Sequence, residues 1–131
     1  MPEQIHVLVV DDEPAISRAV GIALSRAGYR VTTALSGESA LATVRAEPVD
    51  VLVVDLRLRD MRGDALFEYA AAIQPHLRTH TLFTTGDISE RAEQIIEACG
   101  CAFLRKPFDL KDVIQSVASM TRSLGHRNGV A

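Results

Sequence analysis

The sequence lacks any long hydrophobic run and any strong net charge, and each absence excludes a class of protein. No apolar stretch approaches the roughly 18 residues that cross a membrane, and acidic and polar residues follow Met1 where a signal peptide would need an apolar segment. The formal net charge of −3 gives no general attraction for nucleic acid. We therefore expect a soluble cytoplasmic protein with no membrane contact and no direct nucleic-acid contact.

Residue patterns for soft-metal, redox or nucleotide chemistry are also scarce. Cys99 and Cys101 are separated by one residue, which is too close for an ordinary disulfide, and two thiols are fewer than the four ligands of structural zinc. The four histidines follow no metal-ligand spacing. Neither the P-loop nor the dinucleotide-binding glycine signature is present. We expect reduced, partly buried thiols and neither nucleotide hydrolysis nor redox work.

Five aliphatic or β-branched segments alternate with five segments of helical periodicity. This pattern favours a parallel sheet with helices on both faces and right-handed crossovers, and 131 residues fit one domain. We expect the domain over residues 1–124 and a polar tail over 125–131. The expected strands are Ile5 to Val10, Tyr29 to Ala34, Val49 or Val51 to Asp55, Thr79 to Thr84 and Cys101 to Leu104. The expected helices run from Asp12 or Glu13 to Gly28, from Ser36 as N-cap to Glu47, and over Ala65 to Ile73, Ser89 to Cys99 and Leu110 to about Leu124.

Four of the expected strands end at side chains that can bind phosphate or a metal. Any one of these endings is also what an ordinary loop start looks like. In a parallel sheet, however, the carboxyl ends of the strands lie side by side, and ligands bind in the crevice outside them. We therefore predict that the four ends form one pocket. The residues at these ends are Asp11 and Asp12, Asp55, Thr84 and Thr85, and Arg105 and Lys106.

The predicted pocket brings together the carboxylates of Asp11, Asp12 and Asp55. Like charges within a few ångströms raise one another's pKa and destabilise the fold, so a cation is needed among them. Carboxylate oxygens with a backbone carbonyl and waters suit Mg²⁺, and no cysteine or histidine nearby argues for a softer metal. Alternatively, one member of the Asp11–Asp12 pair caps the first helix while the pair also binds metal.

The same pocket contains groups suited to phosphoryl transfer. Lys106 offers a compact positive charge, and the hydroxyl of Thr84 or Thr85 can hold a phosphoryl oxygen. Phosphoryl transfer needs mainly in-line positioning and charge stabilisation, which a carboxylate nucleophile beside Mg²⁺ and a lysine supply. Because Asp55 stands alone at its strand end, we predict that Asp55 is the acceptor.

In this order and spacing, the residues resemble the receiver domain of two-component response regulators, over about residues 5 to 123. The resemblance implies a chemotaxis-regulator-like (βα)5 fold with the strand order 2-1-3-4-5. It is carried by Asp11-Asp12 in the sequence Val-Asp-Asp-Glu-Pro, Asp55 closing an aliphatic strand, Gly63 eight residues later, Thr85 before Gly86, and Lys106 before Pro107.

The resemblance also implies roles for the site residues. Asp55 would take a phosphoryl group from a phosphohistidine on a sensor kinase or phosphotransfer domain, with Mg²⁺ required. Asp12 would bind Mg²⁺ directly and Asp11 largely through water, with Asp55 and the Arg57 backbone carbonyl as the other ligands. The chain would be a phosphoacceptor with at most intrinsic self-phosphorylation and self-dephosphorylation, and not an enzyme.

The family's output is a change of surface. Thr85 and Lys106 would move toward the new charge, and the space left would admit an aromatic side chain from strand five, here Phe103. The surface of helix four, strand five and helix five would then control a protein target or self-association. Phe103 lacks the hydroxyl group that is common at this position, and the plain alternative is that Phe103 belongs to the core. The lysine–proline peptide Lys106-Pro107 is expected to be cis.

Some features depart from the family or stay open. Arg59 stands where the family commonly has proline. Arg57 either pairs with the phosphoryl group, obstructs water, or is, like Arg62, a solvated loop charge. A haloacid-dehalogenase-type phosphatase would need a second acid at the position of Arg57, so that alternative is disfavoured. The remaining alternative is a receiver-like interaction module that is never phosphorylated.

Partner choice is expected to depend on the first helix. We predict that its contribution to kinase recognition comes from four residues. These are Ile16, Ser17, Val20 and Leu24. Whether the chain acts alone or is part of a longer protein stays open.

Overall fold

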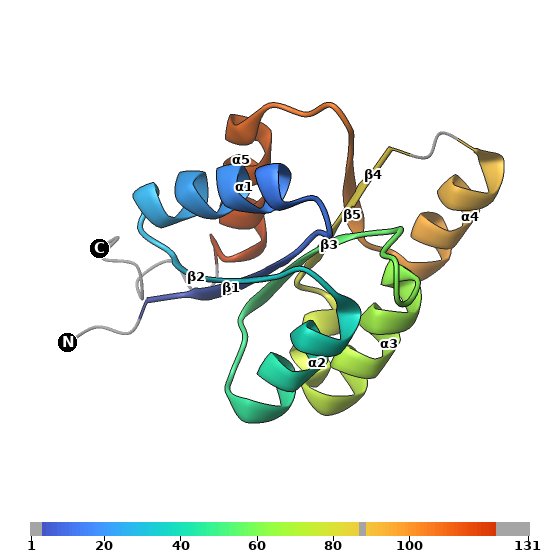
Figure 1. Cartoon of the computed structure of the whole chain (residues 1–131), viewed down its shortest axis with the longest axis horizontal. Coiled ribbons are helices and arrows are strands. Elements are labelled where there is room, and N and C mark those ends of the chain that lie inside the picture. Colours follow the sequence, from blue (N-terminus) through green and yellow to red (C-terminus); the bar gives the residue numbers. More distant parts are fainter. Residues whose placement is uncertain (1–3, 87–88, 123–131) are drawn as a thin grey trace.

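The structure is a computed structural model, which describes residues 4–86 and 89–122. A single parallel sheet of five strands, in the order β2-β1-β3-β4-β5, lies between two layers of helices (Figure 1). The strands are β1 (His6–Val10), β2 (Arg30–Ala34), β3 (Val51–Asp55), β4 (Thr81–Thr85) and β5 (Ala102–Arg105). The helices are α1 (Pro14–Arg26), α2 (Gly37–Ala46), α3 (Gly63–Ile73), the short 3-10 helix η1 (Pro75–Arg78), α4 (Glu90–Cys99) and α5 (Leu110–Met120). The predicted doubly wound α/β fold and strand order are confirmed.

The core consists of two hydrophobic clusters, one on each face of the sheet. Alternate residues of β1 enter different clusters: Leu8 and Val10 pack with side chains of α2, α3 and α4, whereas Val7 and Val9 pack with side chains of α1 and α5. All five residues of β1 are buried. This two-sided burial explains why the strand is a continuous aliphatic run without alternating polar residues.

Local sequence signals account for most helix boundaries. Pro14 occupies the first turn of α1, and the Ser36 hydroxyl accepts the N–H of Ser39 at the start of α2. Gly100 ends α4 in the left-handed conformation with φ 71°, which favours glycine. The acidic pair does not cap α1 with a side-chain bond, because the N-cap is Glu13; Asp11 Oδ1 instead accepts the N–H of Glu13 at 2.9 Å.

Several predicted boundaries differ from the observed ones by two to four residues, including the end of α1 at Arg26 instead of Gly28. The fourth strand begins at Thr81 because η1 and its cap at Thr79 occupy the preceding residues. The third helix begins at Gly63, before the predicted Ala65. The last helix ends at Met120, because Thr121 leaves the helical conformation and its hydroxyl bonds back to the Val117 carbonyl at 2.9 Å. The predicted end at Leu124 and the predicted tail lie outside the described residues.

The predicted recognition residues of α1 are mostly buried, which corrects the prediction for that helix. Ser17, Val20 and Leu24 are only 3%, 2% and 0% exposed, because they form the stripe of α1 that packs onto the sheet. Ile16 is partly buried against the same cluster. A partner that approaches α1 would instead meet exposed side chains such as Arg18 and Ile22.

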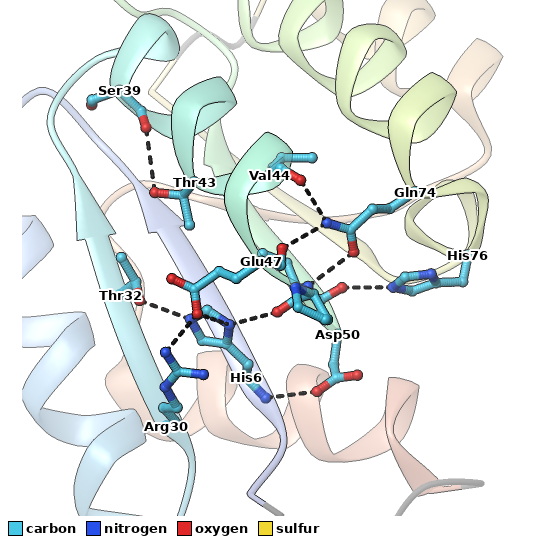
Figure 2. Close-up of polar contacts among 12 residues, drawn as sticks. His6, Arg30, Thr32, Ser39, Thr43, Val44, Glu47, Asp50, Gln74 and His76 are labelled. Carbon is cyan, nitrogen blue, oxygen red and sulfur yellow. Dashed lines mark hydrogen bonds and ion pairs between the residues drawn. The ribbon is translucent and has the colours of Figure 1, made fainter.

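A polar network anchors the end of the sheet opposite to the predicted pocket (Figure 2). The Gln74 side-chain amide donates to the carbonyls of Val44 and Glu47 and accepts the N–H of Val49, each at 2.9 Å. Buried His6 contacts the Pro48 carbonyl through Nδ1 at 2.8 Å. These bonds join the end of α3 to the end of α2 and to the start of β3, where backbone groups would otherwise lack partners.

We expect Gln74→Ala to lower the free energy of unfolding by about 2 kcal/mol, because three backbone groups lose a partner together. Thr43→Ala is a suitable control, since the Thr43 hydroxyl bonds only the Ser39 carbonyl on an exposed helix face at 3.4 Å, and we expect a change within about 0.5 kcal/mol. Urea unfolding followed by circular dichroism measures both. Equal stabilities of the two variants would contradict the anchoring role of Gln74.

Candidate functional site

The carboxyl ends of β1, β3, β4 and β5 meet at one edge of the sheet, as the sequence predicted. Val10 pairs with Val54, so Asp11 and Asp55 follow side by side. Asp55 pairs with Thr84, and Lys106 follows directly after β5. The backbone N–H of Lys106 donates to the Thr85 carbonyl at 2.8 Å. The strand register therefore brings all four predicted strand ends into one site.

Three carboxylates form the acidic part of the site. One oxygen of each of Asp11, Asp12 and Asp55 lies within 4.8 Å of the others. Asp11 and Asp55 are only 3% and 6% exposed. Within the described part of the chain this is the one group of three or more side chains suited to holding a metal. Three close carboxylate oxygens, of which those of Asp12 and Asp55 belong to residues that line an open pocket, fit a hard divalent cation such as Mg²⁺.

Lys106 is the central cation of the site. Its Nζ lies 2.9 Å from Asp55 Oδ2, 3.0 Å from Asp11 Oδ2 and 3.1 Å from Glu13 Oε1. Burial favours the neutral amine, but the hydrogen bonds and charges of Asp55 and Asp11 outweigh burial and raise the pKa of Lys106. The ammonium is therefore held in its charged form between two buried carboxylates.

Burial dominates the electrostatics of Asp55. It raises the pKa of the Asp55 carboxyl, although hydrogen bonds from Lys106 and from the backbone N–H of Arg57 act in the opposite direction. The Arg57 N–H reaches Asp55 Oδ1 at 3.1 Å, so both carboxylate oxygens have a donor. A further positive charge at the site would favour the ionised, nucleophilic form of Asp55.

The loop from Leu56 to Arg62 holds the rim of the site in place. Asp60 accepts the backbone N–H groups of Gly37 and Glu38, each at 2.9 Å, and these two bonds lower the pKa of Asp60. The bonds attach the loop to the first turn of α2, where a carboxylate is favourable. Sequence reasoning missed Asp60, because its partners lie more than 20 positions away.

Glycine is required at position 63 because there is no room for a side chain, and not because the backbone adopts a conformation that favours glycine. Only Gly28 and Gly100 among the described glycines have positive φ, so Gly63 does not use a backbone conformation that favours glycine. A Cβ atom at position 63 would lie 2.2 Å from the carbonyl oxygen of Asp55. The absence of a side chain therefore lets α3 begin directly against the residue that carries the central carboxylate.

The loop arginines lie at different places around the site. Arg57 is exposed and lines the open pocket with Asp12, Asp55 and Lys106. Arg59 Nε lies 3.7 Å from Asp12 Oδ2, whereas Arg62 Nε pairs with Asp64 at 3.0 Å. The three arginines are thus not equivalent solvated charges, because one of them faces the acidic cluster directly.

Other predicted residues are placed as follows. Thr84 and Thr85 are both buried, and the Lys106–Pro107 peptide is cis, as expected. Phe103 is 41% exposed, so the alternative of a core residue is wrong. Glu13, which contacts Lys106, was treated only as a helix start, although its position next to the acidic pair was a usable signal.

The two cysteines lie apart from the site. Cys99 and Cys101 are free and partly buried, and burial raises the pKa of the Cys101 thiol to about 11. Such thiols are poor nucleophiles and metal ligands.

Across residues 4–86 and 89–122, none of the helices combines the length and apolar character that spanning a membrane requires.

Comparison with known proteins identifies the family. The response regulator receiver domain profile matches residues 7–118. The chain belongs to the response regulator receiver domain family. It is 34% identical over 123 residues to the probable transcriptional regulatory protein TcrX of Mycobacterium tuberculosis, covering 94% of this chain and 52% of TcrX. This receiver domain therefore spans about half the length of that relative.

Solved receiver structures share the fold. The chemotaxis protein CheY4 of Vibrio cholerae has a TM-score of 0.80 and 28% identity, covering 89% of this chain and 98% of CheY4. A response regulator of Burkholderia pseudomallei, solved with a phosphorylated aspartic acid, a calcium ion and citrate, has a TM-score of 0.77 and 25% identity, covering 92% of this chain and 71% of that one. The chain is a receiver domain of the two-component signalling type.

The raised pKa of Asp55 gives a prediction for stability. A carboxyl group whose pKa is raised by folding stabilises the folded state at pH values below its ordinary pKa, here 3.8. This stabilisation is lost as the pH rises through the raised pKa of the folded state. We therefore expect Asp55→Asn to be more stable than the parent protein near pH 7 in the presence of EDTA. The difference should shrink as the pH is lowered toward 3.8. Urea unfolding across this range measures it, and a difference that is independent of pH would contradict the prediction.

Proposed function

We propose that Asp55 accepts a phosphoryl group from a phosphohistidine on a sensor histidine kinase or a histidine phosphotransfer domain. The observation that carries this proposal is the position of Asp55, whose carboxylate lies 2.9 Å from Lys106 and within 4.8 Å of the Asp11 and Asp12 oxygens. An Asp55 oxygen attacks the phosphorus, the phosphorus–nitrogen bond of the phosphohistidine breaks, and the imidazole leaves with the bonding electron pair. The product is an aspartyl phosphate.

The other site residues would stabilise the charge of the group in transfer. When bound, Mg²⁺ supplies positive charge to the carboxylates and to the phosphoryl oxygens. Asp12 would hold it directly, Asp11 largely through water, and Asp55 and the Arg57 carbonyl would complete the protein ligands. Lys106 and the hydroxyl of Thr85, which is our choice over Thr84 because Gly86 follows it, would each bind one phosphoryl oxygen.

The proposed output is a change at the surface of α4, β5 and α5. Phe103 lies beside α4 and lines a groove with Ile96 and Glu97. A phosphoryl group adds roughly two negative charges, so Thr85 would move toward Asp55 and Phe103 would enter the space that Thr85 leaves. The altered surface would control a protein target or association with a second copy. We propose that these steps take place in the cytoplasm. We also propose that the receiver domain ends near residue 124.

Labelling tests the acceptor directly. We expect incubation with acetyl phosphate and Mg²⁺, followed by borohydride trapping and mass spectrometry, to modify Asp55. Asp55→Asn should abolish this modification, and EDTA should reduce it at least about tenfold, because the carboxylate charge is then uncompensated. Asp64→Asn, which removes a carboxylate from the first turn of α3, should leave it unchanged. Absence of modification in the parent protein would favour the phosphorylation-independent interaction module.

Amide exchange tests the proposed output surface. Beryllofluoride, which mimics a phosphoryl group on a carboxylate, should change protection in α4, β5 and α5 beyond the change within the loops of the site. The same addition to Asp55→Asn is the control and should leave protection as it was. Unchanged protection over residues 89–122 in the parent protein, with labelling of Asp55 intact, would contradict the surface but not the acceptor.

A further inference from the structure

Two basic side chains, Lys106 and Arg59, contact different carboxylates of the acidic site. Lys106 contacts Asp11, Glu13 and Asp55 at 3.1 Å or less. Asp12 is not among these contacts; its carboxylate instead faces Arg59, whose Nε lies 3.7 Å from Oδ2. In the described part of the chain, Arg59 is the one cation paired with Asp12. The carboxylate expected to bind the metal directly is therefore the one that an arginine already faces.

The backbone around Arg59 is anchored, although its side chain is not. The next residue, Asp60, is fixed to α2 by its two bonds to backbone amides, and the strand-like bridge between Arg57 and Arg62 closes the loop. The Arg59 side chain is 88% exposed, whereas that of Asp12 is 17% exposed. The anchored loop thus places the guanidinium group at the rim of the site. Because the side chain is almost fully exposed, it can move away from Asp12 into solvent.

We propose that Arg59 is a tethered counter-ion of Asp12, which the divalent cation must displace, so that Arg59 raises the concentration of Mg²⁺ needed to fill the site. This inference rests on the proposed function. Two positive charges within a few ångströms of one carboxylate repel each other, so arginine contact and metal binding at Asp12 oppose each other. A residue without charge at this position would leave Asp12 open.

The expected effect is modest, because the pair is exposed and screened by water. Exposed ion pairs are typically worth a change of about two- to five-fold in an equilibrium constant. We therefore expect Arg59→Gln to bind the metal about two- to five-fold more tightly than the parent protein. Since salt screens exposed charges, this difference should diminish as the concentration of potassium chloride is raised.

Arg62→Gln is the matched control. It removes the same charge from the same loop, but the Arg62 side chain pairs with Asp64 and not with Asp12. Manganese binding, followed by the paramagnetic resonance signal of free Mn²⁺ and by competition with Mg²⁺, measures affinity without reference to phosphorylation. The Nε–H resonance of Arg59 in the parent protein gives a second readout, and it should shift as Mg²⁺ is added.

The outcomes separate this inference from the proposed function. Tighter binding by Arg59→Gln alone supports the inference. Equal affinities in all three proteins, or an equal gain in both variants, would overturn it, because only long-range charge would then be acting. If the parent protein binds no Mn²⁺, or if Asp12→Asn binds it equally well, the metal site of the proposed function fails as well.

Discussion

The contact of one ammonium group with three carboxylates is the interaction on which the site depends. Lys106 supplies a positive partner to the carboxyl groups of Asp11 and Asp55, which are almost completely buried, since an unpaired buried charge is very costly. The compensation is incomplete, because Asp11, Asp12, Glu13 and Asp55 place four carboxylates at the site, where Lys106 and the exposed Arg59 are their cationic partners. The remaining excess of negative charge makes a divalent cation the natural complement of the site.

The fold holds this charge arrangement from two sides. On one side, the loop after β3 is tied to α2 through Asp60, and α3 starts against the Asp55 carbonyl at Gly63. At the far end of the sheet, the Gln74 network fixes the ends of α2 and α3 (Figure 2). The edge strand β5 is different, because Phe103 is exposed there. The part of the molecule that these hydrogen bonds connect thus carries Asp55, and the less covered part lies toward β5.

Sequence reasoning predicted the sheet and the site because both depend on local patterns. Buried strands are continuous aliphatic runs, and their polar ends converge in any parallel sheet, so Asp11, Asp55 and Lys106 could be placed together in advance. It failed where the outcome depends on contacts between distant segments. Asp60 binds amides 22 and 23 positions away, and the stripe of α1 that packs on the sheet was mistaken for a docking surface. Periodicity shows that a helix has two faces, but the tertiary contacts decide which residues a partner can reach.

The bonds of Lys106 also connect the site to two distant parts of the chain. Lys106 begins the connection from β5 to α5, while Glu13, 93 positions earlier, is the N-cap of α1. Helices α1 and α5 cover the same face of the sheet (Figure 1). A phosphoryl group on Asp55 would offer the ammonium new oxygen acceptors, and a hydrogen bond to one of these oxygens would weaken the hold of Lys106 on Glu13 and Asp11. Phosphorylation of Asp55 would then act on the start of α1 as well as on β5, because the Lys106 side chain links both to Asp55.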